Sequence, residues 1–300
     1  MKTANQLIPL QSTSITLYIK REDIIHPVIS GNKFRKLKYN LLKAKSEAQS
    51  CVLTFGGAFS NHIAAVAAAA KENGMQSIGI IRGEELQYKI FENPTLQFAA
   101  DCGMHLEFVN RQEYRKKDSL EFVTALQERF GRFYMLPEGG TNDFAIVGCG
   151  EILAAEDSLF DYICCAVGTG GTVSGIINSS SKHQQILAFP ALKGEFIESD
   201  IHKFATKDNW QVISGYEFGG YGKINTELID FINEFYKNYA IPLDPIYTGK
   251  MLFGVMDLIA KGFFPAGSKI LVIHTGGLQG IKGMNIKLKN KNLPLIVTND

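Results

Sequence analysis

Short apolar segments and longer amphipathic segments alternate along most of the chain. The short segments are rich in β-branched residues and predict strands over residues 14–21, 50–55, 76–81, 105–109, 131–136, 162–167, 185–189, 210–214 and 270–274. The longer segments predict helices over residues 33–47, 61–72, 93–101, 117–130, 144–156, 172–180, 226–239 and 249–261. This alternation predicts an α/β fold. The segment 286–300 is polar with one apolar patch and fits neither pattern.

The chain shows no low-complexity linker and no internal repeat, so we expect two α/β units that share a cleft. The larger unit is predicted to consist of residues 1–47 and 146–300, and the smaller one of residues 48–145. Each is expected to hold an open, twisted, mostly parallel sheet flanked by helices. Ligands of such sheets bind beyond the carboxyl ends of the strands, and the unusual residues of this sequence fall there.

Composition excludes several classes of protein. The 300 residues carry 31 basic and 30 acidic side chains, so no overall field attracts nucleic acid or an anionic membrane. The N-terminal segment lacks the apolar core of a signal peptide, and no apolar run approaches the roughly 20 residues of a membrane span. The five cysteines form no C-x-x-C pair, and the six histidines are scattered. We therefore expect a cytoplasmic protein with buried free thiols and no metal site.

One cationic stretch, residues 29–39, is the first candidate for chemistry. It predicts a helix start, with Asn32 as the N-cap after Gly31, and it carries four cations: Lys33, Arg35, Lys36 and Lys38. Lys33 would lie in the first turn, where the positive end of the helix favours a neutral amine. A neutral amine is what Schiff-base chemistry needs. The alternative is an ordinary, solvated basic helix start.

Three glycine loops follow predicted strands. The first, residues 56–62, opens an alanine-rich helix that predicts close packing; Ser60 or Asn61 can cap this helix, and His62 fits a structural hydrogen bond. The second, residues 168–175, predicts a nest of amides for a phosphate, but Val173 breaks the G-x-G-x-x-G pattern and no Walker lysine follows. The third, residues 274–278, presents Thr275, which can equally cap its own loop.

An amine, a phosphate nest and a hydroxyl at three strand ends together suggest pyridoxal phosphate, which needs all three. The sequence resembles the 1-aminocyclopropane-1-carboxylate deaminase and D-cysteine desulfhydrase family, which has the fold of the tryptophan synthase β chain. The resemblance covers nearly the whole chain in the family's order: IKRED at 19–23, GNKFRKL at 31–37, SNH at 60–62, PEGGTN at 137–142, GTGGT at 168–172, GYG at 220–222, DPIYTGK at 244–250 and HTGG at 274–277.

The resemblance implies a role for individual residues. Lys33 matches the lysine that holds the cofactor as a Schiff base. The catalytic residues are expected to be Lys33, Ser60, Tyr221 and Tyr247. The cofactor contacts are expected to be, besides Lys33, residues Lys36, Asn61, Gly168, Thr169, Gly170, Gly171, Thr172, Thr248 and Thr275. The family resemblance also suggests a homodimer.

The same resemblance bears on the reaction. Deaminases of the cyclopropane amino acid resemble one another in having a glutamate where this chain has Thr248, and commonly an aliphatic residue where it has Thr275. We therefore expect a β-elimination that converts D-cysteine to pyruvate, ammonia and sulfide. The alternatives are the cyclopropane deaminase activity, racemisation or dehydration of a D-amino acid, and a non-catalytic carrier of pyridoxal phosphate. A carrier would have no need of Ser60, Tyr221 and Tyr247.

Overall fold

The protein is an α/β structure with two open, mostly parallel sheets. The computed structural model describes residues 1–29, 31–194 and 196–298. Within them, one sheet has the order β1-β2-β10-β7-β8-β9, with strands Asn5–Ile8 (β1), Thr16–Lys20 (β2), Lys269–Ile273 (β10), Tyr162–Val167 (β7), Gln185–Pro190 (β8) and Trp210–Val212 (β9). The other has the order β5-β4-β3-β6, with strands His105–Val109 (β5), Gln76–Arg82 (β4), Cys51–Gly56 (β3) and Tyr134–Met135 (β6). Only the β1–β2 pair is antiparallel among these.

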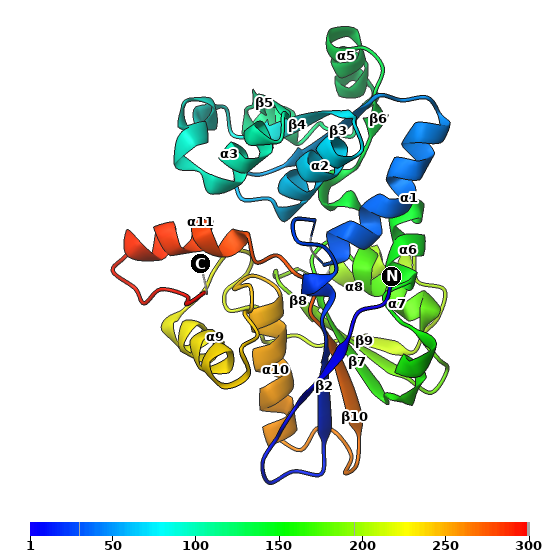
Figure 1. Ribbon diagram of the computed structural model, residues 1–300, viewed down its shortest axis with the longest axis vertical. Coiled ribbons are helices and arrows are strands. Elements are labelled where there is room, and N and C mark those ends of the chain that lie inside the picture. The colour runs from blue at the N-terminus through cyan, green and yellow to red at the C-terminus, as the bar shows by residue number, and fades with distance from the viewer. Residues whose placement is uncertain (30, 195, 299–300) are drawn as a thin grey trace.

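Helices cover both sheets. The α-helices are Asn32–Ser46 (α1), Asn61–Glu72 (α2), Pro94–Asp101 (α3), Arg111–Tyr114 (α4), Leu120–Phe130 (α5), Asp143–Gly150 (α6), Gly171–Ser179 (α7), Phe196–His202 (α8), Thr226–Tyr239 (α9), Thr248–Ala260 (α10) and Gly280–Lys289 (α11). The 3-10 helices are Glu22–Ile24 (η1), Glu84–Glu92 (η2), Glu138–Gly140 (η3) and Ala155–Leu159 (η4). In Figure 1 the two sheets lie one above the other, and α1 runs between the two parts on one side.

The six-stranded sheet is buried on both faces because its strands carry apolar residues at successive positions. In β10, Ile270 and Val272 pack into one core with α9 and α10, while Leu271 and Ile273 pack into another with α7 and α8. Successive side chains of a strand point to opposite faces of the sheet, so this one short strand contributes to two cores.

The four-stranded sheet is covered in the same way. The alanines of α2 are fully buried against β3 and β4, with α3 on their other side. Small side chains allow this close approach, as the sequence predicts. The opposite face packs against α5 through Leu126. All strands of this sheet come from residues 51–135. The boundaries of the two domains stay a prediction.

Each predicted strand and helix is present, with ends shifted by up to several residues. The structure adds elements that the pattern misses. Strand β1 lies at the sheet edge, and α8 is only seven residues long, so both are too short for a clear period. Helix α11 occupies Gly280–Lys289, whereas the pattern predicts neither a helix nor a strand for the segment from 286 onward. The predicted helix 144–156 ends at Gly150, and the predicted helix 117–130 begins at Leu120.

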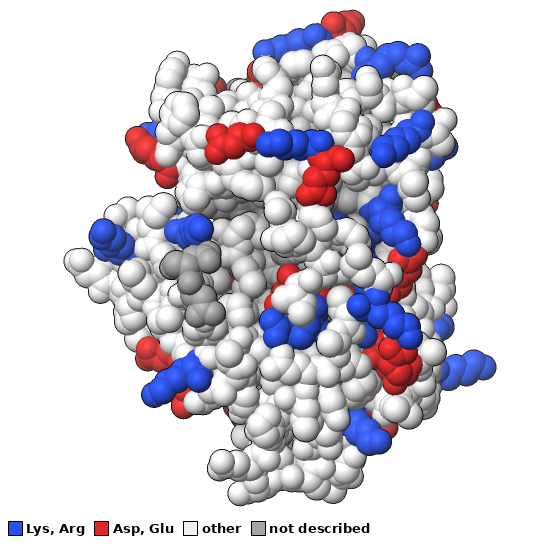
Figure 2. All heavy atoms as spheres, in the orientation of Figure 1, with Lys and Arg blue, Asp and Glu red and all other residues white. Residues whose placement is uncertain are grey.

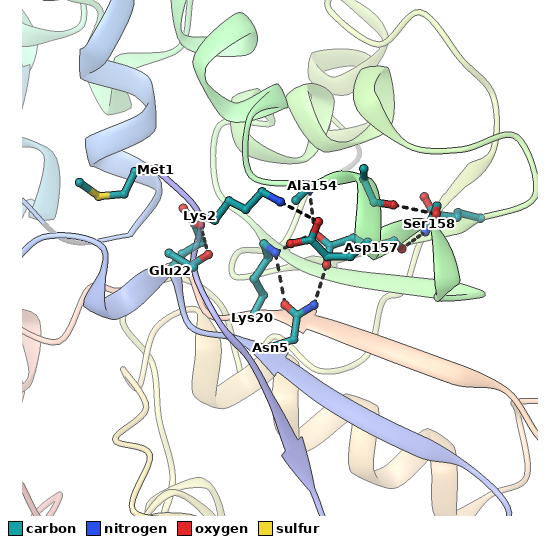
Figure 3. Close-up of polar contacts among 12 residues, drawn as sticks. Met1, Lys2, Asn5, Lys20, Glu22, Ala154, Asp157 and Ser158 are labelled. Carbon is teal, nitrogen blue, oxygen red and sulfur yellow. Dashed lines mark hydrogen bonds and ion pairs between the residues drawn. The ribbon is translucent and has the colours of Figure 1, made fainter.

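A buried ion pair ties the N-terminal strands to η4. The Lys20 ammonium lies 2.7 Å from Asp157 Oδ2, and both side chains are almost fully buried. Figure 3 shows Asn5 beside them; it accepts from Lys20 Nζ at 3.2 Å and donates to Asp157 Oδ1 at 2.6 Å. The polar groups satisfy one another, which is the condition for burying charge.

The mixed surface charges and the free cysteines agree with what the composition predicts. On the face drawn in Figure 2, Lys and Arg are interspersed with Asp and Glu, and a hollow separates the upper part from the lower one. All five cysteines are free, and only Cys102 is partly exposed.

No helix in the described part of the chain is long and apolar enough to cross a bilayer. Within residues 1–29, 31–194 and 196–298, no group of three His, Cys, Asp or Glu could hold a metal ion.

Candidate active site

The cationic stretch begins α1 against the last glycine loop. Gly31, not Asn32, is the N-cap of the helix; it has φ 62° and a Cβ there would lie 1.9 Å from Thr275 O. Asn32 is instead the first helical residue: its backbone N–H donates to Thr275 O at 3.2 Å and its side chain donates to Thr172 Oγ1 at 2.8 Å. The predicted capping role of Asn32 was therefore wrong, because the tight approach to Thr275 admits only glycine at the cap.

The four cations of the stretch have different surroundings. Arg35 is buried and donates twice to Glu22, at 2.8 and 2.9 Å. Lys38 is exposed and pairs with Glu151 at 2.6 Å. Lys33 and Lys36 instead both bind the backbone of residue Gly139. The alternative of a solvated basic helix start therefore holds for Lys38 alone.

The amines of Lys33 and Lys36 converge on one backbone carbonyl. Lys33 Nζ donates to Gly139 O at 3.1 Å, and Lys36 Nζ donates to the same oxygen at 3.0 Å and to Thr141 Oγ1 at 3.0 Å. Burial lowers the pKa of Lys33 well below its ordinary value, and the neighbouring charge of Lys36 lowers it further. Burial lowers the pKa of Lys36 as well. Desolvation, more than the end of the helix, is thus what favours a neutral amine at Lys33.

The second glycine loop begins α7 beside these amines. Gly170 is the N-cap of this nine-residue helix and has φ 76°, a left-handed conformation. The Gly171 N–H donates to Thr169 O at 2.9 Å, and a helix start leaves the next amides without intrahelical partners. Thr169 Oγ1 lies 2.7 Å from Thr141 Oγ1, which also bonds Lys36. The positive end of the helix and the Lys36 amine therefore meet at one place, as an anion site requires.

One substitution tests this anion site without straining the backbone. A Cβ on Gly171 would lie 2.6 Å from Thr141 Oγ1, so Gly171→Ala must displace that threonine. Because overpacking of this kind costs about 1–3 kcal/mol, we expect pyridoxal phosphate to bind the apoprotein about tenfold more weakly or worse. Gly150→Ala is the matched control, since its Cβ would make only ordinary contacts at 3.6 and 3.8 Å. Equal affinity of the two variants in a cofactor titration would place the phosphate elsewhere.

The first glycine loop places two candidates at the start of α2. Ser60 is the N-cap, and its Oγ accepts from Ile63 N at 3.3 Å. Asn61 Oδ1 is buried and has no hydrogen-bond partner among the described residues. A Cβ on Gly277 would lie 2.9 Å from Asn61 Nδ2, so the third glycine loop passes directly over this amide. An orphaned buried acceptor beside a glycine is a place where a ligand would complete the hydrogen bonds.

His62 has the structural role that the sequence predicts. The Thr54 hydroxyl donates to Leu136 O at 3.0 Å, so at 2.9 Å it accepts from His62 Nε2. Burial lowers the pKa of His62 well below its ordinary value, and the ring is neutral. A Cβ on Gly140 would lie 2.7 Å from the ring, so His62 supports the turn whose Gly139 carbonyl receives both lysines.

The two tyrosines and Thr248 lie around the start of α10. The Tyr221 and Tyr247 rings pack edge to face at 6.2 Å, and a Cβ on Gly168 would lie 3.2 Å from the Tyr247 ring. Burial raises the pKa of Tyr247 well above its ordinary value, so its hydroxyl keeps its proton. The Thr248 hydroxyl donates to Asp244 Oδ2 at 2.6 Å.

Sequence reasoning assigned no role to several residues that shape this site. Asp244 is buried and accepts from the backbone N–H of Ile246, Tyr247 and Thr248, so it caps α10. Thr141 bridges Lys36 and Thr169. The only sequence signal for either was its place within the family motifs, because such contacts join segments far apart in the chain.

Comparisons with known proteins agree with this geometry. The family model described as pyridoxal-phosphate dependent enzyme matches residues 3–276. A Pyrococcus horikoshii protein that carries the provisional name 1-aminocyclopropane-1-carboxylate deaminase is 34% identical over 93% of this chain and 90% of its own. An Arabidopsis thaliana protein named bifunctional D-cysteine desulfhydrase/1-aminocyclopropane-1-carboxylate deaminase, mitochondrial, is 29% identical over 88% and 73%. A crystal structure described as an ACC deaminase homologue matches with a TM-score of 0.82 and 30% identity, over 97% and 94%.

The fold and the site thus define a pyridoxal phosphate-dependent enzyme with the tryptophan synthase β-like fold. Within that class, the chain belongs to the 1-aminocyclopropane-1-carboxylate deaminase and D-cysteine desulfhydrase family. The residues present fit the cofactor: a desolvated amine at Lys33, a glycine-lined helix start with Gly170 in a left-handed conformation, and an unpaired acceptor at Asn61. The resemblance stated from the sequence motifs is confirmed.

Proposed function

We propose that the protein catalyses a β-elimination on a small D-amino acid, with D-cysteine as the best substrate and pyruvate, ammonia and sulfide as products. The observation that carries the proposal is the Lys33 amine, which is desolvated and bonded to the backbone oxygen of Gly139 beside the anion site. A neutral amine can take up a proton at that atom, and removal of an α-proton is the step that β-elimination requires.

The cofactor would be held by residues from all three glycine loops. Lys33 would bind its aldehyde, Lys36 and residues 168–172 its phosphate, and Asn61 its ring hydroxyl. When bound, pyridoxal phosphate supplies a ring that takes up the electron pair left on the substrate after the proton departs. Thr275 is proposed to face the ring nitrogen. Thr248 is proposed to lie near the same nitrogen. Its hydroxyl already donates to Asp244, so Thr248 would influence the ring through Asp244.

The substrate would lie between the start of α2 and the tyrosine pair. The Ser60 hydroxyl and the N-terminal end of α2 suit a carboxylate, because a helix N-terminus attracts an anion. Tyr247 keeps its hydroxyl proton and can donate it as a hydrogen bond toward the substrate. Tyr221 packs against Tyr247 and limits the room left for a side chain.

The choice of elimination over ring opening rests on the carboxylate near the site. Opening a cyclopropane ring starts without an α-proton, so it needs a nucleophile or base aimed at the ring carbons. Asp244 lies next to Gly277, yet its Oδ1 accepts from the Ile246 amide and its Oδ2 from the amide and hydroxyl of Thr248. The carboxylate is thus committed to the start of α10 and is not presented to a substrate. Elimination needs only Lys33 and a leaving group such as a thiolate.

A substrate panel tests the proposal. The holoprotein would be assayed with D-cysteine, L-cysteine, D-serine and 1-aminocyclopropane-1-carboxylate, scoring α-keto acid and ammonia. We expect kcat/KM for D-cysteine to exceed that for the cyclopropane amino acid at least about tenfold, which corresponds to about 1.4 kcal/mol between the two barriers. Equal or better turnover of the cyclopropane amino acid would make the deaminase activity, which the relatives' names favour, the correct assignment.

A further inference from the structure

Lys250 is a buried cation that the proposed chemistry does not use. Its side chain is 1% exposed, and its Nζ donates to Glu217 O and Gly220 O, both at 2.8 Å, and to Ala191 O at 3.4 Å. An ammonium group has three N–H donors and no acceptor, so three carbonyl oxygens match it completely.

The position of the Lys250 ammonium destabilises α10, the helix to which Lys250 belongs. Lys250 lies in the first turn of α10, where the positive end of the helix disfavours a cation. Burial lowers its pKa to about 8, against the attraction of the nearby Asp244 and Glu217 carboxylates. A methionine could fill the same space without a buried charge. Stability alone therefore does not explain a lysine at this position, and we look for its role in the contacts that it makes.

The segment that Lys250 holds is residues 215–222, which we call the tyrosine loop. Gly215, Gly219, Gly220 and Gly222 all have positive φ, and so does Phe218 at 49°. Glycine-rich backbone of this kind has many alternative conformations and loses much entropy when it is fixed. Tyr221 stands in this loop and is 52% exposed. Three kinds of contact join the loop to α10: the Tyr216 hydroxyl donates to Asp257 Oδ2 at 2.6 Å, Phe218 packs on Phe253, and Lys250 donates to the Glu217 and Gly220 carbonyls. Of these, the Lys250 hydrogen bonds lie nearest to Tyr221 in the sequence.

We propose that Lys250 is the positioning residue for Tyr221. It binds the carbonyl of Gly220, the residue directly before Tyr221, and it follows Tyr247 by three positions on α10. Lys250 thereby fixes the two tyrosines relative to each other and shapes the end of the site that receives the substrate side chain. The inference rests on the proposed function insofar as Tyr221 contacts the substrate.

A double-mutant cycle tests whether Lys250 acts through Tyr221. Lys250→Met removes the donors and keeps the aliphatic chain, and we expect kcat/KM for D-cysteine to fall about tenfold, mainly through KM. In a Tyr221→Phe background the same change should cost less than about twofold, because the tyrosine hydroxyl is already gone. Lys237→Met, at an exposed position in the last turn of α9, is the matched control and should change neither value. Equal losses in both backgrounds, or no loss in either, would overturn the proposal.

A second readout does not depend on turnover. Hydrogen exchange of the amides of residues 217–222 in the holoprotein should become at least about tenfold faster in Lys250→Met and stay unchanged in Lys237→Met. If D-cysteine is not turned over, the proposed function fails, while the exchange still decides whether Lys250 holds the loop. Unchanged exchange would refute the anchoring itself. Should Lys250→Met not fold, Lys250→Gln, which keeps two donors, carries the same measurements and should show a smaller change in the same direction.

Discussion

Lys33→Ala should abolish turnover, by a factor on the order of 10⁴ or more, while the protein keeps its fold. The substitution removes both the amine that binds the cofactor and the group that moves the α-proton. The fold should survive because the Lys33 amine donates to a backbone carbonyl that Lys36 also holds, so that carbonyl keeps a donor when Lys33 is removed. Steady-state kinetics with circular dichroism of the variant checks both expectations.

The covalent site can be identified directly. Borohydride reduction of the yellow holoprotein should fix the cofactor on Lys33 and remove its visible absorption, and peptide mass spectrometry would locate the label. Lys38→Ala is the control, since that lysine is exposed and pairs with Glu151, and it should retain full activity. A label on Lys36 or Lys38 would sink the assignment of Lys33.

The largest loss of stability is expected from Asp157→Ala. It would leave the Lys20 ammonium buried without its counter-ion and deprive Asn5 and the Ala154 amide of their acceptor. Breaking a buried pair by removing one partner costs about 3–5 kcal/mol. We expect that loss in the free energy of unfolding, measured by urea denaturation of the holoprotein.

The neighbouring residue provides the control for this prediction. Glu156 pairs with Lys2 at 3.0 Å, but their side chains are 49% and 73% exposed. An exposed pair of this kind contributes about 0–1 kcal/mol, so Glu156→Ala should be nearly neutral. If Asp157→Ala were as mild as Glu156→Ala, the buried network of Figure 3 would not stabilise the N-terminal strands.

The fold was predictable wherever a segment repeats one period long enough. The alanines of α2 and the β-branched residues of β7 and β10 fill buried positions that allow few other residue types. Strand β1 was not predictable, because four residues at a sheet edge carry too little pattern and owe their pairing to β2. Helix α8 was missed for the same reason of length.

Site residues were predictable where a residue type is unusual at its position in a helix or loop. A lysine at the start of a helix and glycines after a buried strand are unfavourable unless a ligand needs them, and so they were visible in the sequence. Lys250 and Asp244 were not. The partners of Lys250 lie 30 to 59 positions away, and Asp244 acts on backbone amides that carry no sequence signal. Asn32 was misassigned because its neighbour Gly31 meets Thr275, a contact that only the folded chain creates.

A competition assay tests the central claim, that this enzyme eliminates rather than opens a ring. The holoprotein would receive D-cysteine and 1-aminocyclopropane-1-carboxylate together at equal concentration. Elimination gives pyruvate and ring opening gives 2-oxobutanoate, so the initial ratio of the two products equals the ratio of the two kcat/KM values. We expect at least about ten pyruvate molecules for each 2-oxobutanoate, a difference of about 1.4 kcal/mol between the two barriers. A ratio of one or less would contradict it.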